Sequence, residues 1–578
     1  MAPARLAPRK NAVLLAAIIG LAGARVASTY GTFSETFDEV QHVAAGLDWL
    51  GGSYTLWRDQ KLPHLIVSPP LGRVAVAAGP WLAGLRLGPW RELPYAPPGY
   101  ARNLALARAG VLPFMALAIL LTWALARRAS GDDRVALAAA AILSLCPPFL
   151  GHAGLATTDV AFTALALLAL LALVRWLDGP TPTRAVLAGA AFGLAFATKL
   201  SAPVLGLLAL VAALVRRRVT GRSLGLGWGA GARQASLAAG AAAMVMLGAY
   251  RFDVGTPRGR ADGAVLDEMI DACFTSNTGR SAARALADTT LPAPALFDGM
   301  LALCAQNAPG RGTSYLLGRI SQDGFPLFFP VALAVKAPLP LLALAVAAIV
   351  LLLRRAREHH GETRWELYAL PWLAAAFLAA ASPSRINIGV RHVLPIFPLL
   401  AILAAWALVA ASGAPKPMRA AAAVLAAWML AIPFTAAPDY MAWFNALAGR
   451  HPEEVLLESD LDWGQDLLRL ERALSERGVE RVAIAYWGAA DLCRRDLPPG
   501  RWLKPHAPIE SGWIAISETY RKGVAGFYYR DGEYCDASHF VGSAAPDPTA
   551  YSWLDRYQPV ARVGTSILLY HLQAERAP

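Results

Sequence analysis

Two adjacent acids, Asp38 and Glu39, follow the first long apolar run of the chain, residues 11–29, by nine positions. Ionisable side chains at the edge of an apolar segment are costly, and they persist mainly where they pair or act. Two carboxylates there can take a proton from an acceptor or hold a cation. The chemistry then depends on which other charged groups the chain brings to the same edge.

Later segments supply such groups. Basic residues near a membrane interface suit a phosphate, whose charge must be stabilised as it leaves, and a lipid-linked phosphate presents its head group at this depth. The set therefore predicts transfer of a group from a polyprenyl-phosphate carrier to an acceptor. Its members at the edges of apolar runs are His42, Arg73, His152, Asp159, Lys199, Arg391 and His392, and Lys336 lies inside a run.

These residues also have structural interpretations. Asp38 and His42 are four residues apart and can pair on one helix face. Arg73 can extend to the head groups, as basic side chains near membranes commonly do. Asp159 can be a favourable charge at a helix N-terminus. Arg391 lies just inside an apolar stretch, where a free charge is expensive, and this position favours a function.

The composition is that of a membrane protein. Of the 578 residues, 56% are hydrophobic and 16% are charged, whereas about 25% charged residues are usual in soluble proteins. The apolar runs predict a polytopic α-helical protein, and Pro and Gly in residues 71–88 predict re-entrant or interfacial helices there. The eleven predicted spans are 11–29, 103–126, 134–150, 157–175, 185–200, 202–216, 235–250, 327–353, 366–382, 389–411 and 418–436.

The basic residues gather in short knots between the spans, so the net charge of +12 indicates topology and not a nucleic-acid surface. Placing the N-terminus inside makes every inside loop basic. Residues 1–436 then form a transmembrane catalytic module with outer loops 30–102 and 251–326. All the candidates except Lys336 fall at the outer face. We predict an integral protein of the bacterial inner membrane.

The C-terminal region, residues 437–578, has a different pattern and is predicted to lie outside the cytoplasm. It mixes charged residues with short β-like stretches at 481–487, 513–516 and 566–570, preceded by a helical stretch at 465–477. This pattern predicts a small soluble α/β domain.

Four cysteines fall on the predicted outer side. Cys273 and Cys304 share the outer insert, and Cys493 and Cys535 share the C-terminal domain. An oxidising compartment favours two disulfides, while unpaired thiols remain the alternative because sequence does not test distance. The spacings show no metal-binding pattern.

The landmarks around these charges resemble those of protein O-mannosyltransferases and bacterial glycosyltransferase family 39 proteins. Phe-Asp-Glu at 37–39 and Ser-Pro-Pro-Leu-Gly-Arg at 68–73 resemble the family's acidic pair and its His-Pro-Pro-Leu-Gly-Lys stretch. Here Arg73 replaces the usual Lys, with altered geometry, and Ser68 replaces the usual His. Further similar stretches follow in the same order at 152–159, 193–199, 328–338, 387–395 and 459–466.

The resemblance implies a GT-C type transferase that uses a polyprenyl-phosphate sugar and inverts the anomeric centre in one displacement. It implies that Asp38 is the catalytic base and that Glu39 and Asp159 support the acceptor or the sugar. His42 and His152 are expected to support the acceptor or the sugar as well. The donor phosphate would be held by Arg73, Lys199 and Arg391, with Lys336 and His392 beside them.

The residues leave open the sugar, the acceptor (protein, lipid or glycan) and a divalent metal, and they call for no other cofactor. The sequence contains no Gly-rich phosphate loop, so it gives no reason to expect a nucleotide donor. A transporter or flippase of lipid-linked sugars is an alternative, but it needs charges through the midplane and usually an internal repeat. A non-catalytic envelope-assembly protein, with a soluble tail that binds partners, is another.

Overall fold

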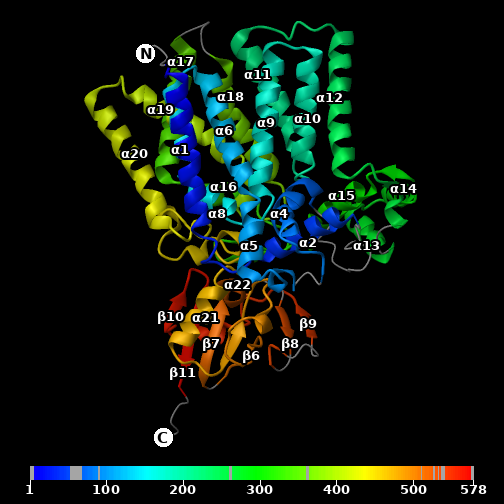
Figure 1. Ribbon diagram of the computed structural model, residues 1–578, viewed down its shortest axis with the longest axis vertical. Helices are drawn as coiled ribbons and strands as arrows, with labels where there is room; N and C mark the ends of the chain where they lie inside the picture. The colour runs from blue at the N-terminus through cyan, green and yellow to red at the C-terminus, as the bar shows by residue number, and fades with distance from the viewer. Residues whose placement is uncertain are drawn as a thin grey trace.

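The computed structural model of the chain describes residues 5–52, 68–88, 92–259, 263–358, 364–509, 511–524, 527–530, 533–535 and 540–573. A bundle of helices forms the upper part of the molecule in Figure 1, and a mixed sheet with short helices forms the lower part. Helix α1 begins at the end of the bundle far from the sheet (Figure 1). The predicted fold class, a polytopic helical protein with a C-terminal α/β region, is confirmed.

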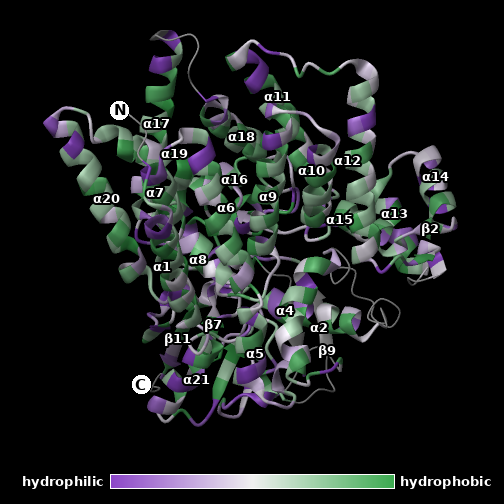
Figure 2. Ribbon diagram, turned by 45° about the horizontal axis from the view of Figure 1, so that its top comes forward, coloured by the Kyte–Doolittle hydropathy of each residue, from purple (hydrophilic) through white to green (hydrophobic). Residues whose placement is uncertain are grey.

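The bundle is built around α19, which is buried from Ile396 to Ala407. Figure 2 shows apolar residues along these helices and hydrophilic ones gathered towards their ends. The bundle helices are α1 (Pro8–Ala27), α5 (Tyr100–Ala109), α6 (Leu112–Ser130), α7 (Asp133–Leu143), α8 (Pro147–Ala153), α9 (Asp159–Asp178), α10 (Pro182–Phe196), α11 (Val204–Thr220), α12 (Trp228–Ala249), α16 (Phe328–Lys336), α17 (Leu339–Glu358), α18 (Trp365–Ala381), α19 (Ile396–Ala411) and α20 (Lys416–Ala436).

The predicted count of eleven spans is not confirmed. Among the described residues, five helices are long and apolar enough to cross a membrane, and α7 with α8, bent by 64°, makes a sixth if counted as one span. Prolines explain part of the difference, because they interrupt a helix. Pro147 follows the break between α7 and α8, and Pro338 separates α16 from α17 within the predicted span 327–353.

Hydrogen bonds and ion pairs draw the basic loops together at the end of the bundle opposite the sheet. Leu6 N donates to Asp133 Oδ2 at 2.9 Å, and Trp365 Nε1 donates to Asp178 Oδ1 at 2.8 Å. Arg128 pairs with Asp178 and, at 3.2 Å, with Glu366. The loops predicted to lie inside thus share one end of the bundle.

The other end of the bundle carries two short helices and an insert. Helices α2 (Phe37–Gly51) and α4 (Pro70–Leu82) pack against each other there. The insert contains the paired strands β1 (Val254–Gly255) and β2 (Leu291–Pro292), the hairpin of β3 (Ser314–Leu316) and β4 (Arg319–Ser321), and the helices α13 (Gly263–Cys273), α14 (Asn277–Ala287) and α15 (Pro294–Gln306).

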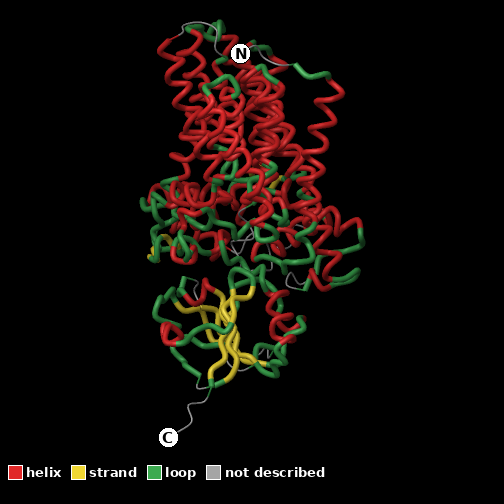
Figure 3. Tube along the Cα trace, turned by 90° about the vertical axis from the view of Figure 1, so that its left-hand side faces the viewer, coloured by secondary structure: helices red, strands yellow, loops and turns green. Residues whose placement is uncertain are grey.

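The C-terminal region is a five-stranded sheet in the order β10-β11-β7-β5-β6 (Figure 3). β5 runs parallel to β6 and β7, and the other neighbouring pairs are antiparallel. The one helix and three strands expected from the sequence are present as α21 (Leu467–Glu476), β5 (Val482–Ala485), β7 (Gly512–Ser517) and β11 (Ile567–Leu572). The structure adds elements that were not expected, which are β6 (Gly500–Trp502), α22 (Glu518–Arg521), β10 (Ala561–Val563) and a separate hairpin of β8 (Phe527–Arg530) and β9 (Phe540–Ala544).

One of the two predicted disulfides forms. Cys273, at the end of α13, is bonded to Cys304 of α15, with their Cα atoms 5.7 Å apart. The predicted Cys493–Cys535 disulfide is wrong: in the described residues these two cysteines are not bonded to each other. The Cys493 thiol donates instead to the carbonyl of Tyr534 at 3.3 Å, a contact that cysteine spacing does not reveal.

Candidate active site

Helix α2 carries both acids of the Phe-Asp-Glu stretch, and a capping box fixes where it begins. The backbone N–H of Thr36, just before the helix, donates to Glu39 Oε2 at 2.8 Å, which is the reciprocal bond of a Thr-x-x-Glu box. Successive residues of an α-helix project about 100° apart. Asp38 and Glu39 therefore face different neighbours.

Asp38 belongs to a chain of four alternating charges. Arg391, in the turn η4 (Val390–Val393), donates from Nη1 to Asp38 Oδ2 at 2.6 Å, and the same nitrogen lies 4.0 Å from Asp159 Oδ2. Lys199 Nζ in turn lies 2.5 Å from Asp159 Oδ1. Asp38 keeps 24% of its side chain exposed, whereas Arg391 keeps 7% and Asp159 keeps 2%. The cluster is therefore buried except at Asp38 and Lys199.

Close helix packing brings these segments together. A Cβ on Gly46 of α2 would lie 2.2 Å from the carbonyl oxygen of Arg73, and one on Gly72 would lie 2.8 Å from the Thr158 methyl. Only glycine permits such approaches. They seat α4 between α2 and the start of α9, so that Arg73 enters the same cluster as Asp38 and Asp159.

Arg73 and three histidines complete the cluster. Arg73 is buried, and its Nε has no hydrogen-bond partner among the described residues. One ring nitrogen in each of the three histidines is likewise buried without a partner there, and these histidines are His42, His152 and His392. Burial first, and then the charge of Arg73, lowers the pKa of His42 to about 4. His42 is therefore neutral at physiological pH and can donate from one ring nitrogen and accept at the other.

Asp38 is ionised at neutral pH. Burial on its own would raise the pKa of this carboxyl, but the charge of Arg391 and the hydrogen bond from it lower the pKa below its ordinary value. Its Oδ2 is occupied by Arg391, while Oδ1 accepts no hydrogen bond from the described residues. One carboxylate oxygen is thus available to a bound hydroxyl or amide.

Glu39 faces the opposite way and is fully bonded. Arg108 donates to both of its oxygens, at 2.8 and 2.9 Å, and the N–H of Ala156 donates to Oε1 at 2.8 Å. Arg108 also donates to three backbone carbonyls between Tyr30 and Ser34. The pair joins α2, α5 and the segment before α9, which is a structural role.

Lys336 also lies apart from the charge chain. It is fully buried, and its Nζ donates to the carbonyls of Met441 and Asp460 at 2.6 and 2.7 Å. The ammonium sits 4.0 Å from the ring centre of Phe444. These contacts tie α16 to the segment that enters the C-terminal region, and they leave little of the ammonium for a phosphate.

Two site residues come from that segment, and sequence reasoning assigned neither a role. The indole of Trp463, which is fully buried, covers Arg391 with Cζ 4.2 Å from the ring centre. Glu458 is half-buried with φ of 54°, an uncommon backbone conformation for a residue other than glycine, and the charge of Arg391 acts on it. The signal for Trp463 was the stretch 459–466 of the family resemblance, whereas Glu458 lies just before that stretch.

Neighbouring acids of that stretch are caps. Asp462 Oδ2 accepts from Thr519 N at 2.9 Å, and Asp466 Oδ2 accepts from the N–H groups of Thr565 and Ser566 at 2.9 and 3.1 Å. They anchor the segment to the C-terminal sheet. Within the described residues, no group of three or more His, Cys, Asp or Glu side chains is arranged to hold a metal ion.

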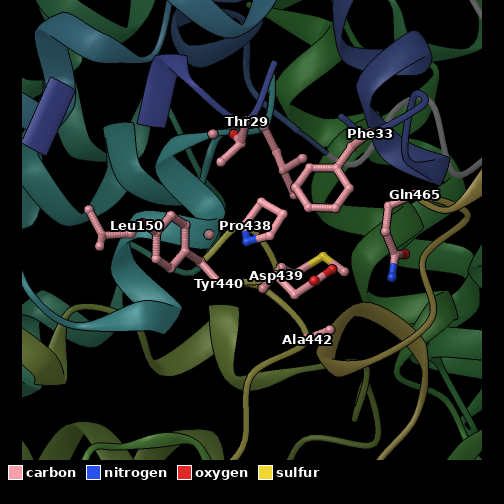
Figure 4. Close-up of a pocket in the computed structure, with 12 residues that line it drawn as sticks. Thr29, Phe33, Leu150, Pro438, Asp439, Tyr440, Ala442 and Gln465 are labelled. Carbon is pink, nitrogen blue, oxygen red and sulfur yellow. The ribbon is translucent and has the colours of Figure 1, made fainter. Parts of the chain in front are cut away.

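Two hollows lie outside the charge cluster. Figure 4 shows a cavity between the end of α1, α8 and the segment 438–442, with Thr29, Phe33 and Gln465 on its wall. Its one charged wall residue, Asp439, is paired with Arg469 at 2.7 Å, so it holds no free charge for a phosphate. The second is an apolar groove of about 300 Å³ between α9, α10, α11 and α12.

Comparisons with known proteins support the family resemblance. Residues 104–246 match the sequence model of the family described as dolichyl-phosphate-mannose-protein mannosyltransferase, which confirms the predicted resemblance over about a quarter of the chain. This stretch holds His152, Asp159 and Lys199. No curated protein matches the chain.

Several solved structures are similar to the fold. ArnT from Cupriavidus metallidurans bound to undecaprenyl phosphate is 17% identical, with a TM-score of 0.48, over 78% of this chain and 68% of that one. An Archaeoglobus fulgidus oligosaccharyltransferase is 15% identical, with a TM-score of 0.44, over 74% and 55%. The S. cerevisiae protein O-mannosyltransferase Pmt1-Pmt2 complex is 15% identical, with a TM-score of 0.32, over 43% and 34%.

Proposed function

We propose that this protein transfers a sugar from a polyprenyl-phosphate donor to an acceptor on the extracytoplasmic face of the membrane, with inversion. The observation that carries the proposal is the charge chain Asp38–Arg391–Asp159–Lys199, which unites four distant segments at one end of an apolar bundle. Buried charges are retained at such cost mainly where they act on a substrate.

The cations of the cluster suit a phosphate. Arg73 and Arg391 each keep a buried Nε without a partner in the described residues, and Lys199 is partly exposed. Such donors can form charge-assisted hydrogen bonds to phosphate oxygens. The neutral histidines beside them can add hydrogen bonds without adding charge. This side of the cluster supports binding of the donor phosphate.

The apolar groove supports binding of the prenyl chain. Its wall runs from Leu205 and Gly206, near the start of α11, to Trp176 and Gln234 at the other end of the bundle. The start of α11 follows Lys199 by a few residues along the chain. A phosphate held by Lys199 could therefore extend its hydrocarbon chain along the groove, where burial of apolar surface stabilises it.

The reaction is a single displacement. The acceptor oxygen or nitrogen attacks the anomeric carbon, its proton passes to Asp38, and the bond from that carbon to the phosphate oxygen breaks. Polyprenyl phosphate leaves with the electron pair, and Arg73 and Lys199 stabilise its charge. Arg391 keeps Asp38 ionised and directs its unbonded Oδ1 towards the acceptor.

The two competing functions predict other features. A flippase needs charges along the bilayer midplane; apart from Lys336 of α16, whose ammonium is bonded to backbone carbonyls, the described middle segments of α6, α9, α17 and α19 contain none. An assembly protein has no need for an ionised carboxylate with one oxygen unbonded. Transport without sugar transfer in proteoliposomes would nevertheless favour the flippase.

The test combines a deletion strain with one variant. Mass spectrometry of its glycoproteins and glycolipids should reveal one missing sugar, which names the donor and the acceptor. Complementation with Asp38→Asn should leave folded protein but lower transfer by about 100-fold or more, since a positioned base contributes this much. The control is Asp288→Asn, an exposed acid in the insert, which should transfer normally. Near-normal sugar transfer by folded Asp38→Asn would contradict the proposed role of Asp38 as the base.

A further inference from the structure

We propose that Trp463 is a positioning residue, by which the C-terminal region holds Arg391 in place between Asp38 and Asp159. The catalytic consequence rests on the proposed function, but the geometric claim does not. The first observation is the stacking of the indole on the guanidinium, with Cζ of Arg391 4.2 Å from the ring centre and both side chains buried.

The same residue also contacts the helix that carries Asp38. The carbonyl of Trp463 accepts from Phe37 N, the first residue of α2, at 3.1 Å. Trp463 thus contacts both sides of the Asp38–Arg391 pair. Its ring covers Arg391, and its backbone carbonyl caps the start of the helix that carries Asp38. A helix N-terminus has N–H groups without intrahelical partners, so this bond satisfies one of them and fixes the direction in which α2 begins.

Hydrogen bonds hold this part of the chain on both sides of the pair. Next to α2, Ser34 N donates to Gln465 O at 3.0 Å, and Ser34 Oγ donates to Gly464 O at 2.8 Å. Next to η4, Val390 N donates to Asp460 Oδ1 at 3.1 Å. Residues 460–465 therefore bridge the two elements, and Trp463 lies in the middle of the bridge.

The indole itself cannot easily turn. It packs with Leu155 and Met441 in one buried cluster and meets the ring of His152 edge-on, with ring centres 6.3 Å apart. A fixed aromatic face over a guanidinium leaves the edge of the guanidinium free for carboxylates. Arg391 uses that edge for Asp38 at 2.6 Å and approaches Asp159 at 4.0 Å.

Removing the aromatic face should therefore change the charge of Asp38 and not only the packing. Without the indole, Arg391 gains rotamers and water, and its pairing with Asp38 weakens. The pKa of Asp38, which Arg391 lowers, should then rise. The loss of an indole that only fills space, as in the Trp487→Leu control, should have no such effect.

The test compares three variants of the full-length protein. Trp463→Met keeps an apolar side chain but has no aromatic face, Trp463→Phe keeps a face, and Trp487→Leu is the control for the loss of an indole's volume. Trp487 also stacks on Phe37, with ring centres 5.1 Å apart, and belongs to the C-terminal region, but its stacking partners are Phe37 and Tyr520, not Arg391. Melting temperatures establish that each variant is folded.

We expect Trp463→Met to lower kcat about 10- to 30-fold, the worth of a desolvated cation–π contact, and to move the acidic limb of the pH profile to higher pH. Trp463→Phe should recover most of kcat, and Trp487→Leu should leave the pH profile in place. A folded Trp463→Met with an unchanged pH profile, or a Trp463→Phe as impaired as the Met variant, would overturn the proposal.

A second readout does not depend on turnover. Carbodiimide labels protonated carboxyls, so the pH midpoint of Asp38 labelling, followed by mass spectrometry, reports its pKa in each variant. We expect a higher midpoint in Trp463→Met than in the wild type and in Trp487→Leu. If the wild type transfers no sugar but this shift occurs, the proposed function fails and the positioning role stands. An unshifted midpoint overturns the positioning role alone.

Discussion

The two faces of helix α2 use neighbouring carboxylates in opposite ways. On one face Glu39 receives hydrogen bonds at both oxygens from Arg108, whose side chain is fully buried. On the other face Asp38 receives one bond from Arg391 and remains 24% exposed. Both acids have an arginine partner and a lowered pKa, so neither the pairing nor the direction of the pKa shift distinguishes them.

What distinguishes them is the remaining hydrogen-bonding capacity. Every oxygen of Glu39 is satisfied by the protein, as in a buried pair that holds elements together. The Asp38 face instead gathers an unbonded carboxylate oxygen, partnerless imidazole nitrogens and two arginine Nε groups among the described residues. Unsatisfied polar groups of this kind concentrate where a protein binds a ligand. We therefore assign a structural role to Glu39 and propose the catalytic role for Asp38.

The largest effect should come from breaking the Glu39 face. Glu39→Gln keeps the cap on Thr36 but leaves the buried charge of Arg108 without its main partner. Breaking a buried pair from one side costs about 3–5 kcal/mol, so the apparent melting temperature in detergent should fall steeply. The surviving folded molecules should keep the pH profile of the wild type, because Asp38 and Arg391 are untouched.

A double variant sharpens this test. Glu39→Gln with Arg108→Met removes both charges, and the loss of stability should be partly recovered. If Glu39→Gln were as stable as the wild type and lost turnover by 100-fold or more, about the contribution of a general base, the two faces would have been assigned the wrong way round.

The sequence anticipated the members of the Asp38 face better than it anticipated the difference between the faces. Asp38, Asp159, Lys199 and Arg391 are conspicuous because charges at the edges of apolar runs are rare, and the structure brings all four together. The partner of Glu39 was not conspicuous. Arg108 lies near the start of a predicted span, where it resembles an ordinary head-group arginine.

Residues outside the apolar runs were harder to find. Glu458 and Trp463 come from a polar segment of a soluble-looking tail, and only the tertiary contact with η4 gives them a place near Arg391. Lys336 stood out as a charge inside a span, yet its partners are backbone carbonyls, which no residue pattern displays. Cys493 and Cys535 show that a shared compartment does not imply a disulfide.

An intermediate effect should come from the groove, which holds the prenyl chain in the proposed function and is lined by neither acid. A Cβ on Gly206, which lines the groove, has open space around it. Gly206→Phe should therefore fill the groove without a clash and raise the KM for a polyprenyl-phosphate donor about tenfold, the equivalent of about 1.4 kcal/mol. The kcat and the melting temperature should change little.

The matched control is Gly240→Phe on α12. A Cβ on Gly240 also has open space, but Gly240 does not line the groove. It should leave the donor KM unchanged. Equal increases in KM for both variants would mean that the groove is not the prenyl site, and a donor with a much shorter prenyl chain should be insensitive to Gly206→Phe if it is.

The smallest effect should come from Glu458, a third carboxyl whose pKa moves in the opposite direction. Burial is the largest influence and raises the pKa of Glu458. The charge of Arg391 lowers this pKa and the charge of Asp38 raises it, and the result is a pKa of about 7. A folded pKa above the unfolded value gives stability that is complete below the unfolded pKa and is lost as pH rises through about 7. Asp38 and Glu39, with lowered pKa values, lose their stabilising contribution as pH falls.

The melting temperature should therefore decline between pH 5 and pH 8, and Glu458→Gln should flatten that decline by an amount of the order of 1 kcal/mol. Some decline should remain, because burial also raises the pKa of Asp462 to about 7, and Asp462→Asn added to Glu458→Gln should flatten it further. A decline that Glu458→Gln leaves untouched would contradict the prediction, because it would show that burial does not raise the pKa of Glu458 above its ordinary value against the opposing charge of Arg391.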